Sequence, residues 1–423
     1  MSKKHYDYRN GPSPIQQHSI AKHRVLEAYL AAYFQTLTSS PNQDVLRLTL
    51  IDGFAGGGEY IHADTNEIVP GSPLICLRAA REAEYLLNQG RRKPIKFDVS
   101  YFLVEANRYA YMHLEHVLRE HGYGQEIGKS IHLRQAKFQD EASEIISFVR
   151  KRSPRNGRSI FILDQYGYKD VPTSLIQSIF RNLPRAEVIL TFGVDSFLNY
   201  ASDSGLTRTL LQELGIENAL QGRRLDEIKA CERDWRLFIQ ANLYRSLVEN
   251  CGARHYTPFF VRNKKGHGDY WLIHLSQHHR ARDVMTEVHW KHNNYFIHYG
   301  GPGLDMFNMV GYDPDFDGSL RRQFELGFEF DDVARAASVA ALTEQVSRLV
   351  YAHEDGLSFG ELFATTCNST PASADIYREA VEKLVDHKVI AVVSPEGIRR
   401  RSAGQINAAD QLTIPGQRPL FVS

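Results

Sequence analysis

The chain has 423 residues, of which 43% are hydrophobic and 24% charged, and its 50 acidic side chains balance 50 basic ones. This length predicts two or three domains with a sizeable buried core. The formal net charge of zero excludes a global basic field, so any binding of nucleic acid must come from a local patch.

The first predicted element in chain order is an amphipathic helix, because apolar residues recur at three- and four-residue spacing from Ile20 to Leu37. Strand-like and helix-like segments then alternate. Strictly alternating segments of this size predict an α/β fold, a Rossmann-like doubly wound parallel sheet with helices on both faces. The strands are expected at 45–52, 97–105, 129–135, 159–165 and 186–192, and the helices at 73–87, 108–122, 141–152 and 174–183.

The alternation stops after residue 204. Helical patterns over 205–254 indicate a helical insertion, and two β-rich runs within 255–276 flank the turn sequence KKGHG, which predicts a hairpin. A doubly wound sheet that closes with an antiparallel hairpin is the plan associated with class I methyltransferases.

The last third of the chain predicts a separate module. A Gly/Pro/Asp-rich stretch indicates a linker, and three helical patterns followed by two short strands around Pro-Glu-Gly have the order of a winged helix. The predicted organisation is an N-terminal helical segment (1–44), a Rossmann-like core (45–204), the insertion (205–254), the closing hairpin and helix of the core (255–300), a linker (301–332), a winged-helix-like domain (333–405) and a tail (406–423).

The compartment is predicted from the cysteines and the N-terminus. The four cysteines form no CxxC pair, which argues against a disulfide framework and a zinc knuckle. No apolar signal-peptide core and no run of about 18 apolar residues occurs. We therefore expect a cytoplasmic protein without an export signal or membrane span.

A glycine-rich loop follows the first predicted strand in the sequence IDGFAGGGEY. Asp52 ends the strand with a carboxylate, and Gly56, Gly57 and Gly58 let the backbone turn tightly and approach a ligand. Ligands of doubly wound sheets bind beyond the carboxyl ends of the strands, where this loop lies. It matches neither the dinucleotide GxGxxG nor the P-loop. The alternative is a tight turn that holds no ligand.

The next two strands also end in polar residues. Glu105 follows the second strand, where a carboxylate can accept hydrogen bonds from both hydroxyls of a ribose. It is alternatively a solvated carboxylate near the start of the next helix. After the third strand, Gln135, Ala136 and Phe138 stand where an adenine ring would be held.

The fourth strand ends in Asp164, Gln165 and Tyr166, which places a carboxylate, a carboxamide and an aromatic ring at the predicted catalytic edge. These groups suit an exocyclic amine and the face of an extruded base. Alternatively, Asp164 caps a helix and Tyr166 is a loop aromatic. Ser72, before Pro73, is expected to be a helix N-cap whose free backbone amides also face a ligand in the loop.

Six histidines cluster late in the chain, but no HExxH motif or Cys/His pairing accompanies them. We expect surface and packing histidines, and no metal site. They are His274, His278, His279, His289, His292 and His298.

Together, the Asp-x-Phe-x-Gly-x-Gly loop, the acidic end of the second strand and the DxYG end of the fourth strand resemble S-adenosylmethionine-dependent methyltransferases. More closely, IDGFAGGGEY, VPGSPLICL, YFLVEAN, FILDQYG and YWLIHLSQHHRARDVMTEVHWK resemble the three-Cys-motif partner proteins (TcmP) over residues 20–300. The resemblance implies a Rossmann-like methyltransferase fold and a bacterial companion protein with three cysteines. With the residues above, it places S-adenosylmethionine at Asp52, Phe54, Ala55, Gly56, Gly57, Gly58, Ser72, Glu105 and Gln135, and catalysis at Asp164, Gln165 and Tyr166.

Two departures limit the chemistry that the resemblance implies. Gln165 stands where amino-methylating enzymes have the first proline of DPPY. This departure puts methylation of a base amino group in doubt. No Pro-Cys dipeptide occurs, so the thiolate of cytosine C5 methylases is missing.

Arg399, Arg400 and Arg401 at the end of the predicted wing supply local charge for contacts with a duplex, although winged helices also bind proteins. The first hypothesis is a methyltransferase that acts on nucleic acid, DNA in particular, in a bacterial or phage modification or defence operon. The second is a methyltransferase-like module that recognises DNA or a partner without turnover. A small-molecule methyltransferase is disfavoured by the long insertion and the winged helix.

Overall fold

The structure is a computed structural model that describes residues 7–15, 17–155, 157–165, 169–193, 205–231, 235–261, 270–292, 296–297, 302–304, 330–353 and 356–415. The chain divides into two compact units. The first contains Met1–Ala230 and Asn242–Val288, and the second contains Cys231–Ala241 and His289–Ser423. The exact boundaries of the seven predicted segments remain a prediction.

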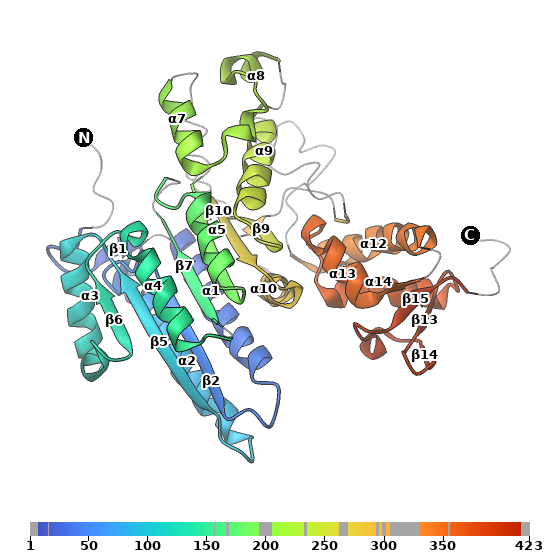
Figure 1. Cartoon of the computed structure of the whole chain (residues 1–423), viewed down its shortest axis with the longest axis horizontal. Helices are drawn as coiled ribbons and strands as arrows, with labels where there is room; N and C mark the ends of the chain where they lie inside the picture. The colour runs from blue at the N-terminus through green and yellow to red at the C-terminus, as the bar shows by residue number, and fades with distance from the viewer. Residues whose placement is uncertain are drawn as a thin grey trace. The chain divides into compact units, whose positions relative to one another are not determined.

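The central sheet of the first unit has the strand order β9-β10-β8-β7-β2-β5-β6 (Figure 1). Neighbours from β8 to β6 run parallel, and β10 runs antiparallel to both β8 and β9. This order confirms the predicted doubly wound sheet of the class I methyltransferase type with an antiparallel closing hairpin. The strands are β2 (Val45–Asp52), β5 (Lys96–Val104), β6 (Ile131–Arg134), β7 (Ser159–Leu163), β8 (Ala186–Phe192), β9 (His255–Val261) and β10 (Tyr270–Ser276).

The middle strands form because most of their residues, on both faces, are apolar. Every residue of β7 and β8 is buried, as in parallel sheets that are covered on both sides. Helices α1 and α2 pack side by side, as do α4 and α5, and Figure 1 shows the two pairs on opposite faces of the sheet. The helices of this core are α1 (Gln17–Leu37), α2 (Ser72–Gln89), α3 (Arg108–Glu120), α4 (Phe138–Arg152), α5 (Thr173–Asn182) and α10 (His279–His292).

A second, small sheet was not predicted from the sequence. Strand β1 (Ser13–Ile15) runs parallel to β3 (Glu59–His62), which pairs with β4 (Ile68–Pro70). The β3–β4 hairpin is inserted between the glycine loop and α2. The N-terminal segment is therefore fixed next to the glycine loop instead of forming only a helix.

The segment expected to be a helical insertion is helical in its described residues. It contains α7 (Gly205–Leu214), the 3-10 turn η2 (Glu217–Leu220), α8 (Leu225–Cys231) and α9 (Trp235–Asn250).

The second unit contains a winged helix, as predicted. Helices α12 (Asp332–Ala352), α13 (Phe359–Thr366) and α14 (Ala374–Asp386) precede the wing strands β13 (Ala391–Val393) and β14 (Arg399–Arg400). Ser358 begins α13 with a capping box that uses Glu361. Strand β15 (Gln411–Thr413), within the expected tail, pairs with β13 and β12 (Leu357–Ser358).

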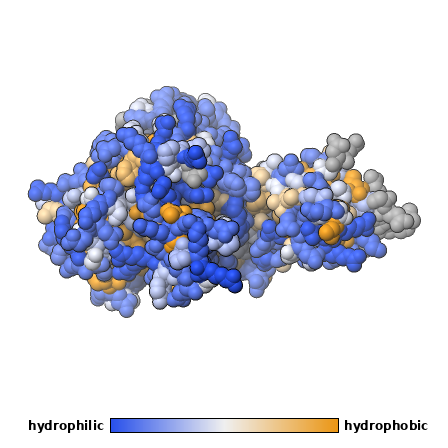
Figure 2. All heavy atoms as spheres, turned by 60° about the horizontal axis from the view of Figure 1, so that its bottom comes forward, coloured by the Kyte–Doolittle hydropathy of each residue, from blue (hydrophilic) through white to orange (hydrophobic). Residues whose placement is uncertain are grey.

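One face of the molecule can be judged from its hydropathy. Figure 2 shows a mainly hydrophilic side of the molecule with scattered hydrophobic residues. In the described residues, no helix combines the length and the apolar character that crossing a bilayer requires.

Candidate functional site

The sheet register brings three acidic residues to one edge. Asp52, the last residue of β2, lies opposite Leu103 of β5 and Ile162 of β7. Glu105 and Asp164 each come two residues after these partners, so all three carboxylates lie at the carboxyl ends of adjacent parallel strands. The charges of Asp164 and Glu105 both raise the pKa of Asp52, which confirms that the three groups are close.

Asp52 is a buried carboxyl group with an incomplete set of partners. Its side chain accepts a hydrogen bond from Phe54 N at 3.1 Å and hydrogen-bonds with Ser72. Its Oδ2 has no partner in the described part of the chain. Burial raises the pKa of Asp52 to about 7, against the lowering effect of these hydrogen bonds. The group therefore changes charge near neutral pH, at a position that admits a further hydrogen-bond donor or a cation.

Glu105 links the glycine loop to the start of α3 through its two oxygens. Oε2 accepts a hydrogen bond from Gly56 N at 2.8 Å, and Oε1 accepts one from Asn107 N at 2.6 Å. Burial nevertheless raises the pKa of Glu105 above its usual value. Ala106 also hydrogen-bonds with this carboxylate, which has about four lone-pair sites and is only partly buried, so some acceptor capacity remains.

The glycines are required by packing of the chain itself. Gly56 and Gly58 have φ of +62° and +84°, a conformation that favours glycine. A Cβ at Gly57 would clash with the ring of Tyr8, and one at Gly56 would clash with the hydroxyl of Tyr60. The N-terminal segment and the β3–β4 hairpin thus pack directly on this loop.

The other residues proposed for the cofactor are placed as follows. Ala55 is buried and donates to Val104 O at 3.0 Å, and the ring of Phe54 lies 6.4 Å from that of Phe138. Gln135 is exposed, directly after β6. The predicted N-cap role of Ser72 is wrong, because Gly71 is the N-cap of α2 and the Ser72 hydroxyl turns to Asp52 instead.

Asp164 has a partner that the sequence did not reveal. Lys22 Nζ, from α1, lies 2.6 Å from both carboxylate oxygens of Asp164, and the side chains of Lys22 and Asp164 are 12% and 32% exposed. Thr191 of β8 also hydrogen-bonds with Asp164. Burial raises the pKa of Asp164, but the Lys22 charge and these hydrogen bonds outweigh it, so the pKa lies below its usual range. Asp164 is therefore a permanently charged acceptor of hydrogen bonds and a weak base.

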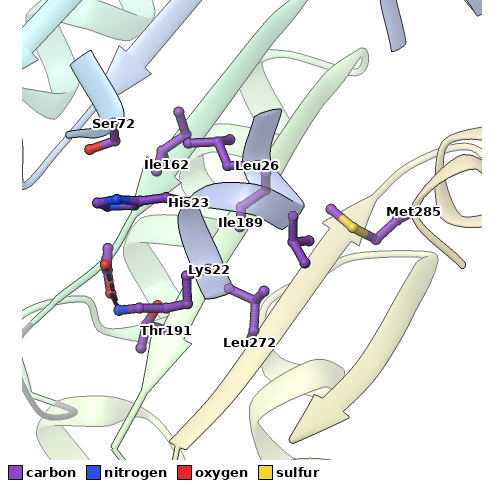
Figure 3. Close-up of a pocket in the computed structure, with 11 residues that line it drawn as sticks. Lys22, His23, Leu26, Ser72, Ile162, Ile189, Thr191, Leu272 and Met285 are labelled. Atoms are coloured by element: carbon purple, nitrogen blue, oxygen red, sulfur yellow. Dashed lines mark hydrogen bonds and ion pairs between the residues drawn. The ribbon is translucent and has the colours of Figure 1, made fainter. Parts of the chain in front are cut away.

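A cavity of about 30 Å³ lies beside this ion pair, between α1 and the strands (Figure 3). It has room for roughly one or two water molecules. His23 lies between Ser72 and Lys22 in Figure 3, and burial together with the Lys22 charge lowers the pKa of His23 to about 4, so its ring is neutral at pH 7. The cavity is lined by Lys22, His23, Val25, Leu26, Ser72, Ile162, Asp164, Ile189, Thr191, Leu272 and Met285.

Gln165 is buried, and its carbonyl oxygen accepts hydrogen bonds from Asp170 N and Val171 N at 2.9 and 3.1 Å. This arrangement holds the loop after β7 and occupies the oxygen that was expected to meet an acceptor. Tyr166, the third proposed catalytic residue, lies outside the described residues.

The histidines are distributed over different surroundings. His274 is buried and its Nε2 lies 2.9 Å from Glu187 Oε2 and 3.1 Å from Tyr29 Oη, whereas His278 is exposed and its ring is close to that of His279. His289 is buried, and nothing is described for His298 or for the side chain of His292. Within the described residues, no three His, Cys, Asp or Glu side chains form a group that suits a metal ion.

The three wing arginines are not equivalent. Arg400 Nε pairs with Asp410 Oδ2 at 3.3 Å, and the Asp410 side chain is 1% exposed. Arg399 and Arg401 are exposed. The charge available to a partner on this wing therefore comes from Arg399 and Arg401.

A family model described as a GMT-like wHTH domain matches residues 311–397. This match agrees with the winged helix of the second unit. A search of curated proteins finds no match to the chain.

Solved structures match parts of the chain at low identity and low TM-score. A Legionella pneumophila protein is 10% identical, with 65% of this chain and 92% of that chain covered and a TM-score of 0.35. Trm1 from Pyrococcus horikoshii, solved with S-adenosyl-L-methionine, is 11% identical, with coverage of 62% and 57% and a TM-score of 0.29. A human methyltransferase 10 domain containing protein is 9% identical, with coverage of 60% and 82% and a TM-score of 0.26. The fold assignment rests on the strand order described above.

Proposed function

We propose that this chain binds S-adenosylmethionine and is a methyltransferase that acts on nucleic acid, DNA in particular. The observation that carries the proposal is the meeting of Asp52, Glu105 and Asp164 at one edge of a class I methyltransferase sheet, beside a glycine turn with positive φ. Following the TcmP resemblance, we place it in a bacterial modification or defence operon with a three-cysteine companion.

The site's residues fit this cofactor. The unpartnered Oδ2 of buried Asp52 can accept a hydrogen bond from a ligand, and Glu105 keeps acceptor capacity for ribose hydroxyls. Ser72 orients Asp52 through its hydroxyl. When bound, S-adenosylmethionine supplies an activated methyl group, so the protein mainly has to align the acceptor.

Asp164 is suited to that alignment. Its lowered pKa keeps it ionised, and a carboxylate accepts hydrogen bonds from an amino group without itself needing a proton. Because a weak base takes up a proton poorly, we assign Asp164 to holding the acceptor, with the proton passing to solvent.

The winged helix supports the choice of nucleic acid. Its exposed Arg399 and Arg401 provide two cations at the end of the wing. Each can neutralise one phosphate, which is a modest electrostatic contribution and demands further contacts elsewhere.

A second function, a module that binds DNA or a partner without turnover, is favoured by one observation. Lys22 and Gln165 already engage the groups at the catalytic edge, since Lys22 pairs with Asp164 and the Gln165 oxygen holds its own loop. Such a module would keep the cofactor site and lose methyl transfer.

Calorimetric titration with S-adenosylmethionine and S-adenosylhomocysteine tests the proposal. Asp52→Asn and Glu105→Gln are expected to weaken both ligands at least tenfold, whereas Glu120→Gln, on the exposed face of α3, leaves them unchanged. Binding by the wild-type protein without methylation of DNA or RNA favours the second function. A folded protein that binds neither ligand contradicts both uses of the site.

A further inference from the structure

The ion pair between α1 and β7 places a side-chain amine at the catalytic edge. We propose that the ammonium group of Lys22 occupies the position of the acceptor's amino group beside Asp164, so that the acceptor is an amine that displaces Lys22. This inference rests on the proposed function, because it concerns the acceptor side of the same site.

The geometry supports displacement instead of a shared site. Lys22 Nζ lies 2.6 Å from both Oδ1 and Oδ2 of Asp164, so it faces both carboxylate oxygens at once. An ammonium group only donates hydrogen bonds, as an acceptor's amino group would toward a carboxylate. Thr191 already donates to Asp164 from β8. A carboxylate offers about four lone-pair sites, and Lys22 and Thr191 take three of them, so an incoming amine that hydrogen-bonds to both oxygens has to displace Lys22.

The charge distribution singles out Lys22 as the internal occupant. Among the described residues that line the cavity, Lys22 supplies the positive charge, because burial keeps His23 neutral at pH 7. Apolar side chains of α1, β7, β8 and β10 form most of the remaining wall, including Leu26, Ile189 and Leu272. In such surroundings Asp164 without a cation is costly, so the site favours exchange of one cationic or amine donor for another.

The acceptor class follows from this exchange. An amine with two N–H groups can replace both Lys22 contacts, whereas a hydroxyl group has one donor and a ketone, ester or thioether has none. The site therefore selects nitrogen acceptors over acceptors that lack such donors.

Comparing the affinities of two ligands distinguishes an effect on the cofactor site from an effect at the acceptor position. S-adenosylhomocysteine lacks the transferable methyl group, whereas sinefungin carries an amine-bearing carbon in place of the methyl-bearing sulfur. We expect Lys22→Met to strengthen sinefungin binding about tenfold relative to S-adenosylhomocysteine in calorimetric titrations, because the ligand's amine then has Asp164 to itself.

Matched variants assign the effect to Asp164. The gain should disappear in Lys22→Met/Asp164→Asn, and Arg24→Met, which removes an exposed cation from the same helix, should change neither ligand. An unchanged ratio of the two dissociation constants in a Lys22→Met protein that binds S-adenosylhomocysteine overturns the inference alone. If no variant and no wild-type protein binds S-adenosylhomocysteine, the proposed function fails, and the inference fails with it.

A measurement on the wild-type protein covers the case in which Lys22→Met does not fold. Lys22 should acetylate slowly with a water-soluble acylating reagent, because its ammonium group is paired and only 12% of its side chain is exposed. Saturating sinefungin should accelerate acetylation of Lys22, read by peptide mass spectrometry, while S-adenosylhomocysteine should not. Equal rates with both ligands would contradict displacement.

Discussion

The two units of this protein differ in where they place buried charges, because the buried carboxylate of the second unit, Asp410, lies at the wing and is paired with Arg400. The first unit buries Asp52, Glu187, Arg282 and Asp283 among its helices and strands. The core of the second unit is an apolar cluster in which Leu342, Val346 and Leu362 are fully buried, while ion pairs such as Arg348–Glu344 are exposed. Burying a charge costs free energy unless partners compensate, so a buried charge with an incomplete set of partners is a candidate for contact with a ligand.

Most of the buried charged side chains named for the first unit have partners within the protein that offset the free-energy cost of their burial. Tyr29 donates a hydrogen bond to Glu187, which also contacts His274, and this network joins α1 to β8 and β10. Lys22 pairs with Asp164 in the same layer. Asp52 is different, because its Oδ2 has no hydrogen-bond partner among the residues that the structure describes and its pKa is raised to about 7. The incomplete group is the one that a ligand is expected to complete.

The largest expected effect concerns the pH dependence of stability that Asp52 causes. Its folded-state pKa of about 7 lies above the ordinary aspartate value of 3.8, so its contribution to stability is fully present below pH 4 and is lost as pH rises through 7. The free energy of unfolding of wild type minus that of Asp52→Asn should fall between pH 4 and 8 by an amount on the order of 4 kcal/mol. Urea denaturation at stepped pH measures this difference.

Ser72→Ala sharpens this test. The Ser72 hydrogen bond lowers the pKa of Asp52, so removing it should move the loss of stability to higher pH. A difference between wild type and Asp52→Asn that stays flat, or rises with pH, would show that Asp52 is not a desolvated carboxyl group.

The apolar core of the second unit provides the next largest effect. Leu342 is fully buried in that core, and Leu342→Ala should destabilise the winged helix by about 3 kcal/mol through lost packing and a cavity. Titration with S-adenosylhomocysteine should remain unchanged, because the proposed ligand residues belong to the first unit. Val333→Ala, at a position that is 77% exposed, is the control and should melt like wild type. Loss of ligand binding in Leu342→Ala would contradict the assignment of the ligand site to the first unit alone.

The sequence predicted the elements whose signal is local. Strands β7 and β8 are mainly apolar runs, as buried parallel strands require, although β8 also buries Glu187. Asp52, Glu105 and Asp164 were found because each ends or follows such a strand. The carboxyl ends of parallel strands share one edge, so the topology alone brought these residues together.

What the sequence did not reveal depends on distant contacts. Lys22 and Asp164 are 142 residues apart, and a lysine on the polar side of an amphipathic helix gives no sign of a partner. The small sheet of β1, β3 and β4 has strands of three or four residues, too short for a clear alternation. Gln165 was interpreted from its place after β7, but its carbonyl oxygen turns to the loop that follows.

An effect of intermediate size is the difference in coupling energy between a largely buried ion pair and an exposed one. Lys22 and Asp164 are 12% and 32% exposed, so the double-mutant cycle of Lys22→Met and Asp164→Asn should give a coupling energy of about 2 kcal/mol. Arg348 and Glu344 are 74% and 67% exposed, and their cycle should give about 0.3 to 0.5 kcal/mol. Urea denaturation of the wild type and the six variants measures both values. Equal coupling energies would remove the proposed contrast between the two units.

The smallest effect concerns the surface of the second unit. Its core is an apolar cluster, so we expect any contact with a partner to be made by surface residues. Arg399→Ala and Arg401→Ala should each lower the slope of log affinity against log salt by about 0.9 for a mixed-sequence DNA duplex, because each removes one phosphate contact. Arg400→Ala should act mainly on stability, since it leaves the buried carboxylate of Asp410 without its cation. Fluorescence anisotropy at several salt concentrations measures the slopes. A wild-type protein that binds the duplex no more tightly than Arg399→Ala/Arg401→Ala would assign this wing to a protein partner, because a phosphate-binding wing cannot lose two cations without losing affinity.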